Sequence, residues 1–394
     1  MKKIQVLQIG AGGYGARYLD ELLKSKTGIN DCSYELAGVA DPFAASSRHF
    51  DELKVCSVPI YNSPDEFYYE KRADLAVIVS PIHTHAEYIR TCLKNGSNVL
   101  SEKPVTGSLE EHDRLIELER ESCLFVAVGF QDCFSPDVLA LKQDILGGLL
   151  GSPLYFKLLR LNGRGTKYYN RNVWAGKISL QVEKIFDSPL QNAHAHDLQN
   201  MFFLLGDEMD SSVKLESAEA KLWQGNPYIE NYNAVAVRFI TSRGVDVFFY
   251  TAHCTDEDMP APLAEYHFDK AVVKWQDWGI TAHFNDGTIK RYSEGRVNSL
   301  QSFYSALEAV ITGSTPACTL KTARSHTHSV NLVQEFPIIK IPRENLIESD
   351  AERSKAISPG GTYFTIPGLG EALIRSYEEK TLPSEDGISN IISH

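Results

Sequence analysis

The feature that most constrains this chain is a glycine-rich turn that directly follows an apolar run at residues 4–9. Gly10, Gly12 and Gly15 match the pattern G-x-G-x-x-G. The first glycine permits a tight turn, the second lets a pyrophosphate approach the backbone, and the third lets helix and strand pack closely. The spacing predicts a strand, a turn and a helix whose N-terminus holds the phosphates of a dinucleotide.

The residues after the turn support this interpretation. Apolar side chains recur at helical spacing over residues 14–24, and residues 34–40 form a second apolar run that ends at Asp41. A carboxylate at this place accepts hydrogen bonds from both ribose hydroxyls and repels the additional phosphate of NADP. The sequence therefore predicts NAD rather than NADP, and the alternative is a glycine turn that binds no nucleotide.

Size and charge narrow the classes of partner. With 394 residues the chain suits two domains, and 43% hydrophobic with 23% charged residues is typical of a globular protein. The net charge is −12 and no dense run of lysine and arginine is present, which argues against nucleic acid and against an anionic membrane. We expect a small-molecule partner.

The sequence predicts a cytoplasmic protein. No apolar segment is long enough to span a bilayer, and the run before Gly10 is too short for a signal-peptide core. The seven cysteines are scattered and form no Cys-x-x-Cys pair, which favours free thiols in a reducing compartment. They are Cys32, Cys56, Cys92, Cys123, Cys133, Cys254 and Cys318.

Strands and helices alternate through residues 1–130. Buried strands are expected at 73–80, 98–100 and 124–128, with a helix at 85–94 and another that Ser108 and Glu111 open as a capping box. This alternation predicts a Rossmann domain with a doubly wound parallel sheet, whose ligands bind at the carboxyl ends of the strands.

Residues 131–394 show a different pattern, in which strands follow one another without regular helices between them. This predicts an α+β domain with a large, open-faced, mostly antiparallel sheet for substrate binding and oligomerisation, with a C-terminal helix able to pack back on the first domain. Expected strands lie at 154–161, 213–223, 234–240, 245–251 and 271–275, and expected helices at 138–146, 300–312, 323–335 and 369–378. Residues 337–361 are the least regular.

Two stretches carry a family resemblance. Ser-Pro-Ile-His-Thr-His-Ala-Glu-Tyr at 80–88 and Asn-Gly-Ser-Asn-Val-Leu-Ser-Glu-Lys-Pro at 95–104 closely resemble the Gfo/Idh/MocA family of NAD(P)-dependent oxidoreductases. The likeness is close over the first 150 residues and looser to about residue 335. It implies oxidation of a sugar or polyol hydroxyl, or the reverse reduction, and a homodimer or homotetramer. The predicted cofactor-binding residues are Gly10, Gly12, Gly13, Tyr14, Gly15, Asp41, Ser80, Pro81, His83, His85, Glu102 and Lys103.

Lys103 is the first candidate catalytic residue. It follows a sheet strand, and Pro104 after it favours an extended conformation, so its ammonium group is expected to point toward the nicotinamide end of the crevice. There it polarises a substrate oxygen or relays its proton. Glu102 either pairs with that charge or only secures the turn, and the alternative for Lys103 is a surface lysine in a loop.

His196 is the second candidate. In the family an Asp-x-x-x-His motif at this place supplies a carboxylate and a histidine one helical turn apart, and here Asn192 occupies the aspartate position. An amide orients a partner but accepts no proton, so we expect His196 to be the base, with Lys103 assisting and Asn192 orienting. The alternative for His196 is a structural histidine on a helix face, hydrogen-bonded in the domain interface. The alternative for His194 is that it has no role beyond being next to His196 in the sequence. Asp187 has the wrong spacing to replace the carboxylate.

We expect no metal site. The pairs His83-x-His85 and His194-x-His196 have a spacing that rarely chelates from a helix, where residues four apart face the same way. His253, which lies beside an acidic stretch at 256–258, is predicted to belong to a solvated loop.

Residues 162–177 are the expected substrate-binding stretch, because aromatic rings next to amides and guanidinium groups suit a hydroxyl-rich ring. The alternative is an ordered loop or a dimer contact. The candidate residues are Tyr168, Arg171, Asn172, Trp174 and Lys177.

Two other functions stay open because of Asn192. One is a glycosidase that oxidises a sugar carbon transiently, eliminates the aglycone and regenerates its bound NAD, with Tyr168 or Tyr169 acting near the neighbouring carbon. The other is a non-catalytic sensor of dinucleotide and sugar.

Overall fold

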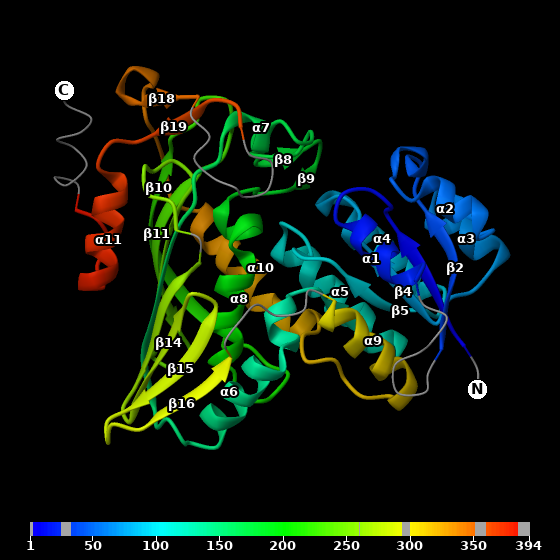
Figure 1. The fold of residues 1–394 in the computed structure, drawn as a ribbon, viewed down its shortest axis with the longest axis horizontal. Helices are drawn as coiled ribbons and strands as arrows, with labels where there is room; N and C mark the ends of the chain where they lie inside the picture. Colours follow the sequence, from blue (N-terminus) through cyan, green and yellow to red (C-terminus); the bar gives the residue numbers. More distant parts are fainter. Residues whose placement is uncertain (1–2, 25–32, 260, 294–299, 351–359, 385–394) are drawn as a thin grey trace. The chain divides into compact units, whose positions relative to one another are not determined.

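The computed structural model describes residues 3–24, 33–259, 261–293, 300–350 and 360–384. It divides into two compact units (Figure 1). The first comprises residues 1–135 and 297–324, and the second residues 136–296 and 325–394.

The first unit is built on six parallel strands in the order β3-β2-β1-β4-β5-β6. Side chains of β1, β2 and β4 to β6 are almost entirely buried, as expected for a parallel sheet covered on both faces. The doubly wound parallel sheet predicted from the sequence is thus confirmed. The strands are β1 Ile4–Ile9, β2 Tyr34–Ala40, β3 Ile60–Tyr61, β4 Leu75–Ile78, β5 Asn98–Ser101 and β6 Val126–Val128.

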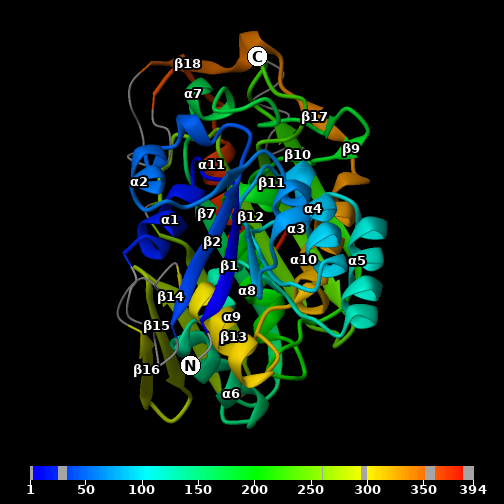
Figure 2. The ribbon, with the colours of Figure 1, turned by 90° about the vertical axis from the view of Figure 1, so that its right-hand side faces the viewer.

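Helices follow these strands and begin at side-chain caps where the sequence provides them. Ser108 accepts a hydrogen bond from the Glu111 amide, and Ser63 accepts one from the Glu66 amide. Helices α3, α4 and α5 contact one another in series (Figure 2). The helices of this unit are α1 Gly15–Leu22, α2 Phe50–Val55, α3 Pro64–Glu70, α4 Ile82–Lys94, α5 Leu109–Ser122 and α9 Gln301–Thr312.

Helix α9 belongs to the first unit, although its residues were assigned to the second domain by their position in the sequence. It contacts β4, β5 and β6. Its buried Phe303 ring meets Tyr18 and Tyr34 edge-to-face, at centroid distances of 6.1 and 5.6 Å. The physical reason for the difference is that an apolar helix packs on whichever exposed sheet face it reaches, and order along the chain does not reveal which one.

The second unit contains a nine-stranded sheet in the order β16-β15-β14-β13-β7-β12-β11-β10-β17. Only the β7–β12 and β10–β17 pairs are parallel, which confirms the prediction of a mostly antiparallel sheet. Strands β13, β15, β16 and β17 were not predicted. The strands are β7 Pro153–Leu161, β10 Leu215–Gln224, β11 Ala234–Thr241, β12 Asp246–Ala252, β13 Leu263–Phe268, β14 Ala271–Gln276, β15 Gly279–Phe284, β16 Ile289–Ser293 and β17 Ile338–Lys340.

Helices lie on both faces of this sheet. Helices α8, Ala195–Leu204, and α10, Leu320–Gln334, lie on one face, and α11, Leu369–Glu379, lies on the other (Figure 1). Helix α11 packs on β7 and β12 of its own unit, whereas the sequence had left open that it returns to the first domain. The other helices and strands of this unit are α6 Pro136–Leu146, α7 Thr166–Tyr169, β8 Ser179–Leu180, β9 Glu183–Lys184, β18 Ile347–Ser349 and β19 Tyr363–Thr365.

The described residues include no helix with the length and apolar character needed to cross a bilayer. Six of the cysteines are free thiols, and Cys32 lies outside the described residues.

We predict that Glu119 makes stability depend on pH. Its carboxylate accepts a 2.7 Å hydrogen bond from the Val126 amide, and burial raises its pKa to about 7. The ionised form is therefore disfavoured in the folded state, so this contribution to stability is fully present below the unfolded pKa and is lost as pH rises toward 7. Glu119→Gln keeps the acceptor and removes the charge.

Chemical denaturation should show Glu119→Gln to be about 1 kcal/mol more stable than the parent at pH 8, and no more stable at pH 4. Glu117→Gln on the same helix is the matched control, because Glu117 is exposed and pairs with the exposed Arg120. A Glu119→Gln gain that is equal at both pH values would contradict the prediction.

Candidate functional site

In the glycine turn, Gly10 and Gly15 have no room for a side chain, whereas Gly12 has room for one. A Cβ at Gly10 would lie 2.5 Å from the Val79 carbonyl oxygen, and one at Gly15 would lie 2.4 Å from that of Gly10. A Cβ at Gly12 would meet no protein atom within 4 Å. Its bare backbone at the start of α1 fits a group that approaches from outside, as the pyrophosphate of a dinucleotide does.

Asp41 is fixed beside this turn at the carboxyl end of β2. Its two carboxylate oxygens accept hydrogen bonds from the Ala11 amide at 2.7 Å and from the Phe43 amide at 2.8 Å. Each oxygen retains a lone pair, so the carboxylate is oriented and still able to accept from a ribose hydroxyl.

His85, in the first turn of α4, connects the loop after β4 with the loop after β5. The buried His85 ring lies 2.8 Å from the Pro104 carbonyl oxygen through Nδ1 and 2.8 Å from that of Ser80 through Nε2. Burial lowers the pKa of His85. His85 therefore fixes these loops to each other, while Ser80 and His83 are half-buried and Pro81 is exposed.

Glu102 is held inside the first unit. It is buried and accepts a 2.8 Å hydrogen bond from the Tyr18 hydroxyl, and burial raises the pKa of Glu102. Its other oxygen lies 3.3 Å from the Lys103 amide nitrogen, which donates to it. Lys103 itself is half-buried, two residues after the end of β5. Tyr18 and Glu102 thus anchor the backbone that presents Lys103.

The sequence predicts Asn192 and His196 one turn apart on a single helix, but in the structure they do not lie on one continuous helix. Residues 189–193 form a π-helical turn, and α8 starts at Ala195 after a break at His194. The turn begins independently because Pro189 occupies its first position and Ser188 caps it through the Gln191 amide. Asn192 and His196 therefore belong to different elements.

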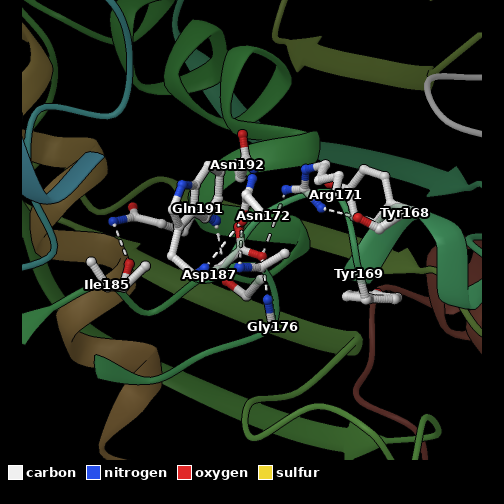
Figure 3. A network of polar contacts seen from close by, with 12 residues as sticks. Tyr168, Tyr169, Arg171, Asn172, Gly176, Ile185, Asp187, Gln191 and Asn192 are labelled. Carbon is white, nitrogen blue, oxygen red and sulfur yellow. Dashed lines mark hydrogen bonds and ion pairs between the residues drawn. The ribbon is translucent and has the colours of Figure 1, made fainter. Parts of the chain in front are cut away.

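Asp187 is the carboxylate that contacts Asn192. Its Oδ1 accepts a 3.1 Å hydrogen bond from the Asn192 amide group, and its Oδ2 accepts a 2.6 Å bond from the Gly176 amide (Figure 3). Arg171 lies 3.8 Å away, and Asp187 is only 3% exposed. Spacing along a helix excluded Asp187, but the chain turns back at Pro189 and brings it to Asn192.

The predicted substrate-binding residues divide into two groups. Arg171 lies over the rings of Tyr168 and Trp174, at 3.8 and 5.0 Å from their centroids. In contrast, the Asn172 side chain accepts from the amides at 174 and 175 in its own turn, and Lys177 pairs with Glu230 at the surface. The structure therefore brings together Tyr168, Arg171 and Trp174, and engages Asn172 and Lys177 elsewhere.

His253 is buried, not solvated as predicted. Its Nδ1 lies 2.9 Å from the Tyr169 hydroxyl, and its ring is 5.4 Å from that of His194. His194 Nδ1 lies 2.6 Å from the Thr251 hydroxyl, so this histidine is more than a neighbour of His196. The physical reason is the pairing of β12 with β7, which draws the residues after both strands into the interior. The signal available in the sequence was the nearly unbroken apolar run of β12, which is typical of a strand buried on both faces.

The two candidate catalytic residues belong to different units, Lys103 to the first and His196 to the second. The predicted catalytic and binding roles remain proposals.

The fold of the first unit defines a class, that of the dinucleotide-binding Rossmann domains. Residues 4–130 match the model of an oxidoreductase family with an NAD-binding Rossmann fold, Gfo/Idh/MocA. The family resemblance predicted from the sequence is thereby confirmed for this part of the chain, as is an NAD-binding domain.

Curated relatives match parts of the chain. Inositol 2-dehydrogenase of Rubrobacter xylanophilus is 29% identical over 157 residues, which cover 40% of this chain and 43% of that protein. Scyllo-inositol 2-dehydrogenase (NAD(+)) of Bacillus subtilis is 29% identical over 235 residues, covering 59% of this chain and 61% of that protein. The chain thus spans less than two thirds of the length of either relative.

Solved structures share the two-domain fold. An oxidoreductase from Agrobacterium radiobacter in complex with NAD+, L-tartaric acid and magnesium superposes with a TM-score of 0.69 at 13% identity, covering 85% of this chain and 96% of that one. The WlbA dehydrogenase from Bordetella pertussis, in complex with NADH and UDP-GlcNAcA, gives 0.67 at 15% identity over 85% and 96%. At these identities the likeness establishes the fold.

We predict that Gly12→Ala weakens NAD binding without weakening the fold. A methyl group at Gly12 meets no protein atom but occupies the space of the pyrophosphate, so calorimetric titration should show NAD affinity reduced at least about tenfold, with the melting temperature unchanged. Gly15→Ala is the contrasting variant, because its methyl group meets backbone and should lower the melting temperature. Unchanged NAD affinity in Gly12→Ala would contradict the assignment of this turn.

Proposed function

We propose that this protein is an NAD-dependent oxidoreductase that acts on a hydroxyl or keto carbon of a sugar, a sugar derivative or a cyclic polyol. The observation that carries the proposal is the open backbone at Gly12 within a domain that matches the NAD-binding family. The partial relatives named as inositol dehydrogenases support a cyclic polyol or sugar as substrate.

The first unit supplies the cofactor site. The glycine turn receives the pyrophosphate at the N-terminus of α1, and Asp41 accepts from the adenosine ribose and disfavours NADP. NAD, when bound, supplies the acceptor for the hydride that leaves the substrate carbon. Ser80 and Pro81 follow the carboxyl end of β4 and His83 lies in the first turn of α4, in the part of the fold where the nicotinamide half of the cofactor is expected.

The second unit supplies the base. His196 is the candidate base for the proton of the substrate hydroxyl. Lys103, from the first unit, is the candidate group that polarises the substrate oxygen. Asn192 orients the substrate or the imidazole, and Asp187 fixes the amide of Asn192 by accepting its N–H. In the family an aspartate occupies the position of Asn192. Here Asp187 supplies a carboxylate that contacts Asn192, so that its charge would act through the amide of Asn192.

The remaining partners are part of the same proposal. We infer a homodimer or homotetramer in the cytoplasm, with no nucleic acid and no membrane among its partners, in keeping with the net charge of −12.

The test is absorbance at the reduced-nicotinamide band while the protein and NAD meet a panel of sugars, cyclic polyols and aryl glycosides. Lys103→Ala and His196→Ala should each lower kcat about 10²- to 10⁴-fold, because proton transfer loses a positioned group. His196→Ala should leave NAD binding unchanged. Lys94→Ala and His283→Ala, on α4 and β15, are matched controls that should keep the parental rate.

Two outcomes would replace the proposal. Release of aglycone without net NADH would favour the NAD-retaining glycosidase. Tight binding of NAD without turnover of any compound would favour the sensor.

A further inference from the structure

Three arginines lie at or after the carboxyl ends of two central strands of the second sheet, β7 and β12. Strands β7 and β12 are parallel neighbours with Arg160 opposite Thr251, so the residues that follow them emerge side by side. The Arg164 amide then donates to the His253 carbonyl oxygen at 3.1 Å. Arg171 follows from the turn after α7. The pKa of His253 is lowered by burial and then by the positive charges of these three arginines.

Two of the three guanidinium groups have carboxylate partners. Arg160 lies 3.2 Å from Asp197 on α8, and Arg171 lies 3.8 Å from Asp187. Asp187 also accepts from Asn192 and Gly176 (Figure 3), so its charge is shared among several donors.

Arg164 has no such partner. Within the described part of the chain it forms no ion pair, and its Nε is buried without an acceptor. Its guanidinium instead lies 5.0 Å from the centroid of the Tyr168 ring, and burial lowers its pKa. The protein thus partly desolvates a cation, and among the described residues only the more distant charge of Asp258 opposes it, with no carboxylate at ion-pair distance. Such an arrangement costs free energy unless a ligand completes it.

The position of Arg164 connects it to the proposed site. The backbone of Arg164 is bonded to that of His253, whose ring contacts Tyr169 and His194. His194 directly precedes α8, on which His196 lies in the first turn. Arg164, Tyr168, His253 and His194 therefore form one local cluster of the second unit, and His196 follows that cluster by two residues along the chain.

A guanidinium group matches the two oxygens of a carboxylate or phosphate, whereas a neutral hydroxyl leaves its charge uncompensated. We propose that Arg164 binds an anionic group of the substrate, a carboxylate or a phosphate, so that the enzyme acts on acidic sugars or sugar phosphates in preference to neutral polyols. This inference rests on the oxidoreductase function proposed above and names its substrate class.

The test compares D-glucuronate, D-galacturonate and D-glucose 6-phosphate with D-glucose and myo-inositol at constant ionic strength. NADH formation gives kcat and KM, and the melting temperature of the NAD-loaded protein reports binding without turnover. The variants are Arg164→Gln, which removes the charge, and Arg164→Lys, which keeps the charge but loses the fork. Arg238→Gln is the matched control, because Arg238 lies on the α11 face of the sheet and pairs with Asp246.

We expect at least one anionic compound to have the highest kcat/KM, and Arg164→Gln to lower that value about 10- to 100-fold, mainly through KM. Arg164→Lys should lie between the parent and Arg164→Gln, and neutral compounds should be unaffected. The preference between carboxylates and phosphate identifies which anion is bound.

Either of two results would overturn the inference and leave the oxidoreductase function intact. One is that neutral compounds have the same kcat/KM as the acids, and the other is that Arg164→Gln has the parental KM for the acids. If no compound yields NADH, the proposed function fails. The shift in melting temperature on adding each compound then tests the anion site by itself. Stabilisation by an acid that disappears in Arg164→Gln supports the anion site, and its absence in the parent overturns it.

Discussion

The parallel pairing of β7 with β12 is the constraint on which the second unit depends. Most neighbours in this sheet are antiparallel, so their carboxyl ends alternate between its two edges. The one central parallel pair breaks that alternation and brings the segments after Leu161 and Ala252 to the same edge. Arginines, a buried histidine and the start of α8 collect there because of this pairing.

The first unit depends on a contact of a different kind, the close approach of two backbones. Gly15 lies so near Gly10 that no side chain fits between them, and Gly10 lies equally near Val79. Helix α1, β1 and the end of β4 are thereby locked around the turn. Gly12 is open in the same turn, so the fold itself explains two of the glycines and leaves the third for a ligand.

Much of the first unit could be predicted from the sequence, because its signals are local. The strand, the glycine turn, the Ser108 cap and Asp41 each depend on residues close together in the chain. The second unit was predicted less well, since Asp187 reaches Asn192 only through a turn that starts at Pro189, and His253 is buried only because β12 pairs with a strand about 90 residues earlier. Periodicity does not report such pairings.

The return of α9 to the first sheet has a consequence for biosynthesis. Its Phe303 ring covers Tyr18 and Tyr34, which are synthesised long before it. Nearly three hundred residues must be synthesised before that cover arrives. The nascent dinucleotide-binding unit therefore exposes apolar surface while every strand of the second sheet except β17 is being made, and chaperones have their longest opportunity to bind it during that interval.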